Sequence, residues 1–404
     1  MRLAAPAAGL GVLALVSVCA ALAWPDDSPL VPLNGGRPGG DVAYAWAFLV
    51  ATIAAFVLYV AALVVLARRG ARLRLVATIA VAIQLVPLGA PLLLSTDAWT
   101  YWSYGRIASV HDANPYRDPP SEFPDDPSFP YVGADWQDTT SVYGPAFTLA
   151  SEPVARAVGE SADAAAWTFK ALAALAVLVA LGLAVRLSPR PVFACAFAGW
   201  NPLLALHFAG GGHNDAWMAA LVLGALSLAA SGRRAWAGAA WAAAVLVKWV
   251  PLIFLPLRAL EARHTGRRLD HRGFAVAAGL LLALATLRYG FGWLEAFGPL
   301  ARNANQETSY ALPHRLQGLG VPKELAVGLL AAGLALAYAL LLREAYRGRA
   351  RLALAACALM LAAPWLVVWY VVWAVPLAAA EDDRTAQLLA LALCAYLLPQ
   401  TIPI

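Results

Sequence analysis

Charged residues are scarce in this sequence of 404 residues. Asp, Glu, Lys and Arg together make up 13% of the chain, whereas 61% of its residues are hydrophobic and the mean hydropathy is +0.66. This balance excludes an ordinary soluble chain of mixed helix and strand and predicts a membrane protein. Cysteine is scarce too, and because all four cysteines lie in apolar segments we expect neither disulfides nor a zinc site. They are Cys19, Cys195, Cys357 and Cys394.

The alternation of polar and apolar residues that is typical of membrane barrel strands is also missing. Instead, apolar runs of about 18 or more residues recur, the length that a helix needs to cross the hydrocarbon core of a bilayer. We therefore predict an all-α fold, a polytopic transmembrane helical bundle that forms a single domain over residues 1–404 with about 10–13 membrane helices. The predicted spans are residues 3–23, 42–67, 73–94, 164–186, 191–209, 215–231, 273–290, 324–342 and 386–402.

The first of these spans has two interpretations. One basic residue precedes residues 3–23, and the run ends in Ala21-Leu22-Ala23, as in a cleaved signal peptide. A polytopic chain can equally use its first span as an uncleaved start signal. The topology predicted for the later spans is the same in both cases.

Arginines indicate how the chain is oriented in the membrane. They cluster in three short loops, which the positive-inside rule places in the cytoplasm. The opposite face is then external, and the net charge of +5 needs no nucleic-acid partner to explain it. We expect a multi-pass protein of the cell membrane. The loop arginines are Arg68, Arg69, Arg72 and Arg74, then Arg186 and Arg190, then Arg233 and Arg234.

Two apolar stretches, 235–258 and 350–380, do not fit one crossing each. Arginines flank 235–258 on both sides, so both of its ends are expected in the cytoplasm. A re-entrant pair of short helices satisfies this condition, with a turn at Lys248-Trp249-Val250-Pro251 that brings Lys248 into the outer half of the membrane. The stretch 350–380 has a similar form, with Pro364-Trp365 and Trp369-Tyr370 at its turn. Broken helices of this kind line a cavity or pack within the protein.

The longest polar segment, residues 95–163, lies on the predicted external side. It holds eleven of the 24 acidic residues and is rich in Pro, Tyr and Trp rather than in Gly and Ser. A long loop of this composition is more often functional than a linker. We expect it to carry the catalytic residues and to contain a short helix over residues 146–158 that lies along the membrane interface.

Asp97 follows directly after the span 73–94. A carboxylate at the membrane boundary, partly desolvated and flanked by aromatic residues, suits a general base, because burial raises its pKa toward a useful range. Helix capping by a solvated charge is the alternative. The position alone does not decide between the two.

Other polar motifs also allow two interpretations. Asn114-Pro115-Tyr116 and Ser141-Val142-Tyr143-Gly144-Pro145 are typical of turns. Trp136 and the tyrosines suit stacking on a sugar ring or a place in an aromatic belt. In Gly210-Gly211-Gly212-His213-Asn214-Asp215, the polar residues fit a helix cap, or a backbone site for an anion.

Lys248 is one of only three lysines and the one most deeply embedded in apolar sequence. An intramembrane cation is costly, so we expect it to pair with a lipid-linked phosphate or to snorkel to the interface. Arg106, Arg302 and Arg315 are further cations on the outer side that could share the first role.

In this order, the motifs resemble those of a known family. The first part runs from Asp97 to Tyr116, with Asp-x-x-x-Tyr-x-x-Tyr-Gly-Arg and Asn-Pro-Tyr, and the second from Trp136 to Pro145. Three more parts follow: Trp200-Asn201-Pro202-Leu203 through Asp215, Val247-Lys248 with Pro251, and Gly290-Phe291-Gly292-Trp293. Over about residues 75–300 the chain resembles actinobacterial polyprenol-phosphomannose-dependent α-(1→6)-mannosyltransferases, membrane glycosyltransferases of the GT-C class.

The resemblance implies a GT-C bundle with a large external first loop. It also implies an enzyme that transfers mannose from polyprenyl-phosphomannose to a lipid-linked or glycan acceptor, with inversion and an α-1,6 linkage. Asp97 matches the catalytic carboxylate of the family. Neither a metal nor another cofactor is expected, because no two carboxylates here have a metal-binding spacing and Arg or Lys can neutralise a leaving phosphate. The other matching residues are expected to bind substrate: Tyr101, Tyr104, Arg106, Asn114, Tyr116, Trp136, Tyr143, His213, Asn214, Asp215 and Lys248.

Two other functions fit a bundle with broken helices. A transporter or flippase of lipid-linked sugars would also need midplane charges and a groove open to lipid, but transporters often have two similar halves and the sequence has no convincing internal repeat. A non-catalytic subunit of an envelope assembly complex would not depend on Asp97. The partners expected of the enzyme are the lipid bilayer, a polyprenyl-phosphate-sugar donor and a glycan or glycolipid acceptor.

Overall fold

The computed structural model describes residues 4–32, 39–266, 269 and 271–403, and all regular secondary structure within these ranges is helical. This confirms the predicted all-α fold. The α-helices are α1 (Ala4–Ala21), α2 (Val42–Arg69), α3 (Leu73–Leu85), α4 (Asp97–Ser109), α5 (Pro145–Val158), α6 (Ala162–Leu187), α7 (Pro191–Gly199), α8 (Pro202–Leu204), α9 (Asp215–Ala230), α10 (Arg234–Val247), α11 (Phe254–His264), α12 (His271–Tyr289), α13 (Phe297–Asn305), α14 (Leu312–Gly318), α15 (Lys323–Tyr346), α16 (Leu352–Ala362), α17 (Val375–Glu381) and α18 (Arg384–Leu397).

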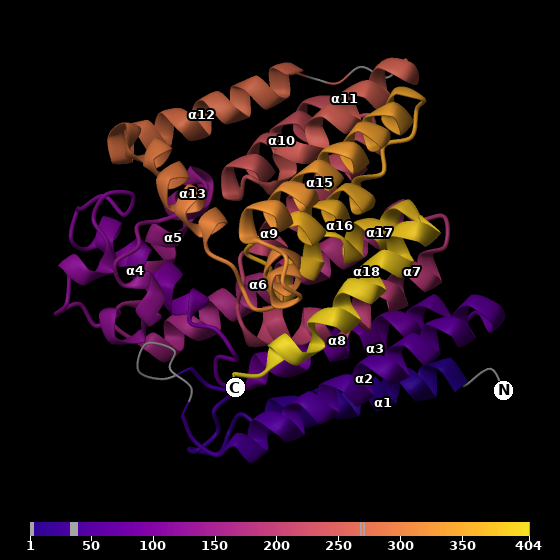
Figure 1. Ribbon diagram of the computed structural model, residues 1–404, viewed down its shortest axis with the longest axis horizontal. Coiled ribbons are helices and arrows are strands. Elements are labelled where there is room, and N and C mark those ends of the chain that lie inside the picture. The colour runs from indigo at the N-terminus through magenta and orange to yellow at the C-terminus, as the bar shows by residue number, and fades with distance from the viewer. Residues whose placement is uncertain (1–3, 33–38, 267–268, 270, 404) are drawn as a thin grey trace.

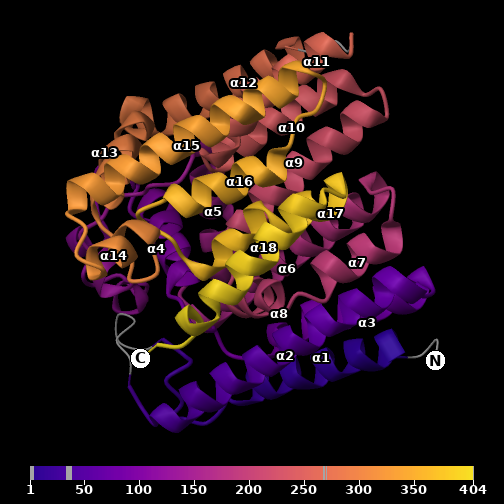
Figure 2. The same cartoon turned by 45° about the vertical axis from the view of Figure 1, so that its right-hand side comes forward.

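The helices are arranged in layers. In Figure 1, α1, α2 and α3 form one edge of the molecule and α10, α11 and α12 lie on the opposite edge. The segment around α4 and α5 lies at one end of the bundle, and α13 and α14 lie at that same end when the molecule is turned (Figure 2). The connection between α2 and α3, which carries an arginine cluster, lies at the other end. The acidic loop and this basic loop are thus separated along the bundle.

Helix length and composition indicate a multi-pass membrane protein. Within the described ranges, five helices are long and apolar enough to cross a membrane, and a bent pair would make six. The remaining predicted spans coincide with apolar helices of 10–17 residues or with the short α18, so the count of 10–13 membrane helices stays a prediction. The five are Ala4–Ala21, Val42–Arg69, Ala162–Leu187, His271–Arg302 and Lys323–Tyr346.

Local sequence signals explain where the long helices begin and end. The side chain of Asp41 accepts a hydrogen bond from the backbone N–H of Ala43 at the start of α2, and Ser161 caps α6 in the same way through Ala164. Gly70, which has a φ of +63°, ends α2 because it adopts a conformation that other residues avoid. These caps satisfy backbone groups that a helix end leaves without partners.

The predicted span 191–209 is not one regular helix. α7 and the segment Pro202–Gly210 meet at an angle of 51°. Pro202 has no N–H to continue the helix, and the side chain of Asn201 accepts a hydrogen bond from the N–H of Leu203 to start a new one. The second segment continues as the π-helical turn η6 (Ala205–Gly210), which leads directly into the glycine run.

Both predicted breaks occur at their predicted positions. α10 ends at Val247, Lys248 has an extended backbone, and η7 (Val250–Ile253) leads into α11. Residues of α10 and α11 line one cavity of about 230 Å³. In the second break, the chain leaves α16, passes Pro364 and forms η9 (Val368–Trp373) before α17. The predicted helix over 146–158 is also confirmed as α5.

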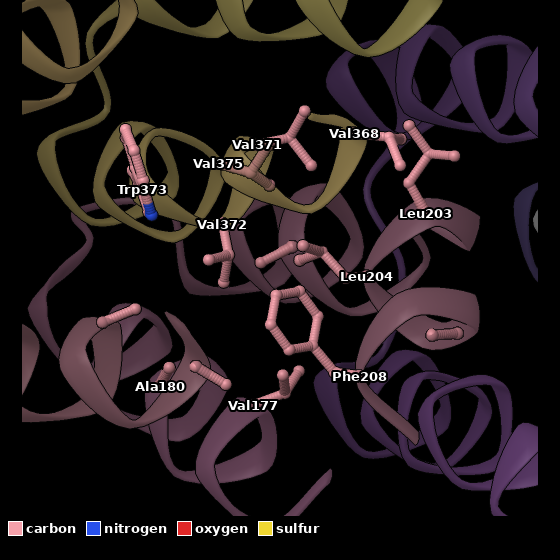
Figure 3. Packing of buried hydrophobic residues seen from close by; sticks show 14 of the residues in the cluster. Val177, Ala180, Leu203, Leu204, Phe208, Val368, Val371, Val372, Trp373 and Val375 are labelled. Atoms are coloured by element: carbon pink, nitrogen blue, oxygen red, sulfur yellow. The ribbon is translucent and has the colours of Figure 1, made fainter. Parts of the chain in front are cut away.

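The second break is held in the centre of the molecule by apolar side chains. Figure 3 shows them packed between α6, the segment Pro202–Gly210 and η9, which are far apart in the sequence. Close packing of this kind fixes the position of the break relative to the glycine run. The labelled residues are Val177, Ala180, Leu203, Leu204, Phe208, Val368, Val371, Val372, Trp373 and Val375.

Candidate active site

A cavity of about 800 Å³ lies where the start of α4, the loop after it, and the two breaks meet. Its volume is in the range of small-molecule sites. Two charged side chains from distant segments, Asp97 and Lys248, line it together with Asp135. The rest of the wall is largely aromatic and aliphatic. The aromatic lining residues are Trp136, Tyr143, Trp249, Trp365, Trp369, Tyr370 and Trp373.

Asp97 is the first residue of α4, and its side chain is 15% exposed. Its Oδ2 atom accepts a hydrogen bond from Nδ1 of His213 at 2.9 Å and another from the hydroxyl of Tyr101 at 3.2 Å. Tyr101 reaches Asp97 because the two residues are four apart on one helix. Oδ1 has no hydrogen-bond partner among the described residues. One oxygen of the carboxylate is therefore held, and the other remains available in the cavity.

The pKa of Asp97 differs from the sequence-based expectation. Burial does act to raise it, as predicted, but the hydrogen bond and charge of His213, the charge of Lys248 and the hydrogen bond from Tyr101 outweigh burial and lower the pKa below its ordinary value. The prediction of a raised pKa was wrong because the sequence did not show these partners. The side chain is therefore ionised at neutral pH and able to accept a proton.

The glycine run places His213 behind Asp97. Gly212 has a φ of +74°, and a Cβ atom there would lie 3.3 Å from the Cβ of Ala98. A Cβ on Gly211 would lie 2.7 Å from the carbonyl oxygen of His207. A side chain at Gly212 would press on α4, and one at Gly211 would press on the π-helical turn η6. The imidazole of His213 is fully buried and stacks on the indole of Trp369, with ring centroids 3.8 Å apart and planes inclined by 12°.

Lys248 is not a free cation. Its Nζ lies 2.7 Å from Oδ1 of Asp215, and the indole N–H of Trp373 donates to the same oxygen at 2.6 Å. Asp215 is 1% exposed, whereas the side chain of Lys248 is 16% exposed and lines the cavity. The ammonium also lies 5.1 Å from the ring centre of Tyr370, within cation–π range. The buried carboxylate and two aromatic rings hold one positive charge at the cavity wall.

Four other predicted site residues do not line the cavity but make contacts that hold the external loop in place. The guanidinium of Arg106 pairs with Asp126, Nε to Oδ1 at 2.9 Å, in a buried contact. Burial acts to raise the pKa of Asp126, but hydrogen bonds from Arg106 and Ser128 outweigh it and lower the pKa to about 2. The other contacts run from Tyr104 Oη to the Thr139 carbonyl (2.7 Å), from Asn114 Nδ2 to the Tyr289 carbonyl (2.9 Å), and from Tyr116 Oη to Thr148 Oγ1 (2.8 Å).

Asn214 and the remaining outer-side cations also lie away from the lining. The backbone N–H of Asn214 donates to the hydroxyl of Tyr101 at 3.4 Å, and its buried amide side chain has no hydrogen-bond partner among the described residues. Arg315 lies over the ring of Tyr310 at 4.5 Å, and Arg302 is exposed. Trp136 and Tyr143, in contrast, do line the cavity, as Lys248 does.

The second break contributes residues to the site that the sequence analysis did not assign to it. Trp369, Tyr370 and Trp373 contact His213, Lys248 and Asp215, respectively. Trp365 lies edge to face with Trp136, with ring centroids 6.1 Å apart. The available signal was the density of aromatic residues at a predicted break in a helix, which favours a cavity wall over a lipid-facing belt.

No group of three or more His, Cys, Asp and Glu side chains that could hold a metal ion occurs in the part of the chain that the structure describes. The polar groups of the cavity are instead one carboxylate held by a histidine and one lysine held by a second carboxylate. The arrangement offers a proton acceptor on one part of the wall and a positive charge on another.

Residues 7–263, more than half of the chain, match the family described as alpha-(1->6)-mannopyranosyltransferase, N-terminal domain. Alpha-(1->6)-mannopyranosyltransferase A of Mycobacterium tuberculosis is 30% identical over 236 residues, 51% of this chain and 44% of that protein. A probable alpha-(1->6)-mannopyranosyltransferase of Mycolicibacterium smegmatis is 28% identical over 215 residues, 49% of this chain and 34% of that protein. The chain thus spans less than half the length of these relatives. No solved structure matches it.

Proposed function

The chain belongs to the alpha-(1->6)-mannopyranosyltransferase family, and we propose that it transfers mannose from polyprenyl-phosphomannose to a lipid-linked or glycan acceptor, with an α-1,6 linkage. The observation that carries this proposal is that a negative and a positive side chain line the same cavity without contacting each other. Asp97 presents an oxygen without a partner, and Lys248 presents an ammonium, to the same space of about 800 Å³. A base for the acceptor and a cation for the leaving phosphate are the two groups that this chemistry needs.

In the proposed reaction, Oδ1 of Asp97 takes the proton of the acceptor hydroxyl while that oxygen attacks the anomeric carbon of mannose. The bond between this carbon and the phosphate oxygen breaks through an oxocarbenium-like transition state, and polyprenyl phosphate leaves from the opposite face with the bonding electron pair. A β-linked donor therefore gives an α-linked product. Lys248 stabilises the negative charge that develops on the phosphate. No metal takes part in this proposal.

The remaining lining residues suit the two substrates. Trp136 and Trp365, edge to face at the cavity, offer aromatic surfaces on which a sugar ring can stack, and Tyr143 lies in the same wall. Val250 and Leu300 provide apolar surface for the first units of a polyprenyl chain. For the predicted site residues outside the lining, we propose that they hold the loop and Asp97 in place. These are Tyr101, Tyr104, Arg106, Asn114, Tyr116, Asn214 and Asp215.

We further propose that the fold is of the GT-C type, with residues 95–163 as an external catalytic loop. The separation of the acidic loop from the arginine cluster between α2 and α3 supports this orientation, since cytoplasmic loops are enriched in Arg. A donor that is anchored in the bilayer by its polyprenyl chain also requires a site at the membrane surface. A transferase, unlike a transporter, needs a general base, and the oxygen of Asp97 without a partner among the described residues suits that role.

The test is transfer of radiolabelled mannose from polyprenyl-phosphomannose to a short α-mannoside, in membranes that contain equal amounts of wild type or variant. We expect wild-type activity, and a loss of about 10²–10⁴-fold in Asp97→Asn, the range typical of general-base catalysis. Asp138→Asn is the matched control, because Asp138 is an exposed carboxylate of the same loop that does not line the cavity, and it should remain active.

Each outcome separates one part of the proposal. An inactive wild type in this assay would contradict the donor and acceptor classes. An active Asp97→Asn variant would contradict the assignment of Asp97 as the base while leaving the donor class supported.

A further inference from the structure

His213 contacts the proposed base from the side that no substrate can reach. Its side chain has no exposed surface, so it cannot touch a sugar bound in the cavity. Its Nδ1 atom lies 2.9 Å from Oδ2 of Asp97. An ionised carboxylate can only accept hydrogen bonds, so Nδ1 carries the hydrogen and donates it. The other ring nitrogen, Nε2, is buried without a partner among the described residues.

We propose that His213 is a positioning residue: it fixes one oxygen of Asp97 so that the other faces the acceptor hydroxyl, and Trp369 fixes the ring of His213. This inference rests on the proposed function, in which Asp97 is the base. It replaces the direct contact between His213 and substrate that the sequence suggested.

The hydrogen bonds of Asp97 explain why its orientation depends on His213. His213 and Tyr101 both donate to Oδ2, and two donors restrict rotation of the carboxylate more than one donor does. His213 has the shorter and ring-locked contact of the two. Without it, Tyr101 alone would hold the group, at 3.2 Å, and either oxygen could turn toward the cavity. A misplaced reacting group costs a large part of the rate.

Trp369 restricts the histidine in turn. The two rings are nearly parallel, with centroids 3.8 Å apart, and the ring of Phe208 lies edge-on to His213 at 6.2 Å. Since Trp369 belongs to η9, the C-terminal break takes part in orienting a base that begins α4. Trp369 and Asp97 are 272 positions apart, and Trp369 lies outside the range 7–263 of the family match.

The proton in this arrangement stays on Asp97. When Oδ1 accepts the proton of the acceptor hydroxyl, the carboxyl becomes neutral and the Nδ1–H of His213 still donates to Oδ2. His213 keeps its Nδ1 hydrogen throughout this step, because that hydrogen remains in the bond to Oδ2. His213 therefore acts on geometry and on the electrostatics of Asp97 and is not itself the proton acceptor.

The charged surroundings give this role a measurable signature. The hydrogen bond from His213 is the main influence that lowers the pKa of Asp97 against burial, so its removal raises that pKa. Because the base must be ionised, the acid limb of the pH–rate profile then moves to higher pH. The other titratable groups that face the pair are Tyr101 and Tyr104 of α4, Tyr143 before α5, His207 of η6, Asp215 of α9, Lys248 after α10 and Tyr370 of η9.

Two substitutions separate the hydrogen bond from the stacking. His213→Phe keeps an aromatic ring against Trp369 but has no donor, whereas His213→Asn keeps an N–H near the position of Nδ1 but loses the stacked ring. We expect His213→Phe to lower kcat about 10–100-fold with the donor KM little changed, and to move the acid limb to higher pH. His213→Asn should retain most of the kcat and the wild-type acid limb. Identical profiles for wild type and His213→Phe would overturn the proposal.

A titration of purified protein by infrared spectroscopy tests the same inference without any transfer assay. The difference between wild type and Asp97→Asn identifies the carboxyl band of Asp97. In the His213→Phe background, that band should titrate at higher pH, and in His213→Asn at the wild-type pH. An unchanged titration in His213→Phe would refute the role of His213, even if the substrates proposed above are wrong. Inactive wild type with the expected shift would instead refute only the proposed function.

Discussion

The ion pair between Lys248 and Asp215 makes a prediction that separates stability from catalysis. Asp215 is 1% exposed and accepts from both Lys248 and Trp373. Lys248→Met keeps a side chain of similar length but removes the positive charge, which leaves a buried carboxylate with only the indole N–H as a partner. Removing one member of a buried pair typically costs about 3–5 kcal/mol. We expect about 3 kcal/mol here, the lower end of that range, because Lys248 is partly exposed and Trp373 still donates.

The double variant Lys248→Met/Asp215→Asn distinguishes the two roles of the lysine. An amide in place of the buried carboxylate would be neutral and could still accept from Trp373, so most of the lost stability should return. Activity should not return, because the cation for the leaving phosphate is still missing; a loss of about 10²–10³-fold is expected by analogy with removing one group that stabilises developing charge. The matched single variant Asp215→Asn keeps the ammonium and should retain more activity than either variant without Lys248.

The measurements are the free energy of unfolding in mixed micelles, from a denaturant titration followed by tryptophan fluorescence, and mannose transfer with each variant at equal protein amounts. Wild-type stability in Lys248→Met would refute the claim that the buried carboxylate depends on the pair. Wild-type activity in the double variant would refute the claim that Lys248 acts on the phosphate, whatever its effect on stability.

Two further predictions concern the external loop. A cysteine introduced at the exposed Asp138 should react with a membrane-impermeant maleimide added outside intact cells. The background should be low because the four native cysteines are buried. Labelling only after the cytoplasm is opened would contradict the orientation. Asp126, whose pKa is lowered to about 2, contributes stability above its ordinary pKa of about 3.9, and this contribution is lost as pH falls from there through about 2. The stability difference between wild type and Asp126→Asn should therefore shrink over that range in thermal unfolding, and a difference independent of pH would contradict it.

The sequence predicted most of the fold because long apolar runs and helix-breaking residues act locally. The length of the run 42–67 requires a helix of the kind seen in α2, and Pro251 and Pro364 mark breaks that the structure confirms. The bend at Trp200-Asn201-Pro202 carried the same kind of signal, a proline after a capping residue, within a run that was otherwise continuous and apolar. That run was therefore predicted as a span without a break.

The partners of the site residues were not predictable, because each contact joins segments that are far apart in the chain. Asp97 and Lys248 were singled out from their polarity in apolar surroundings, and both line the cavity. The direction of the Asp97 pKa depends on His213, 116 positions away, and the carboxylate that Lys248 contacts is Asp215, which the sequence did not indicate as its partner. Polarity and position indicate which side chains need a partner, but only the packing of helices decides which partner each obtains.

The C-terminal break ties these contacts together. Within one short segment, Trp369 stacks on His213, which holds Asp97. Tyr370 contacts Lys248, and Trp373 contacts Asp215, the carboxylate paired with Lys248. The groups proposed to act on the proton and on the phosphate all lie within residues 7–263, whereas Trp369, Tyr370 and Trp373 lie beyond that range. A substitution at any of these three residues is therefore expected to change both the shape of the cavity and the position of the charged groups. Since side chains from one segment contact both charged pairs, a shift of this segment would also move the proposed base and the proposed cation.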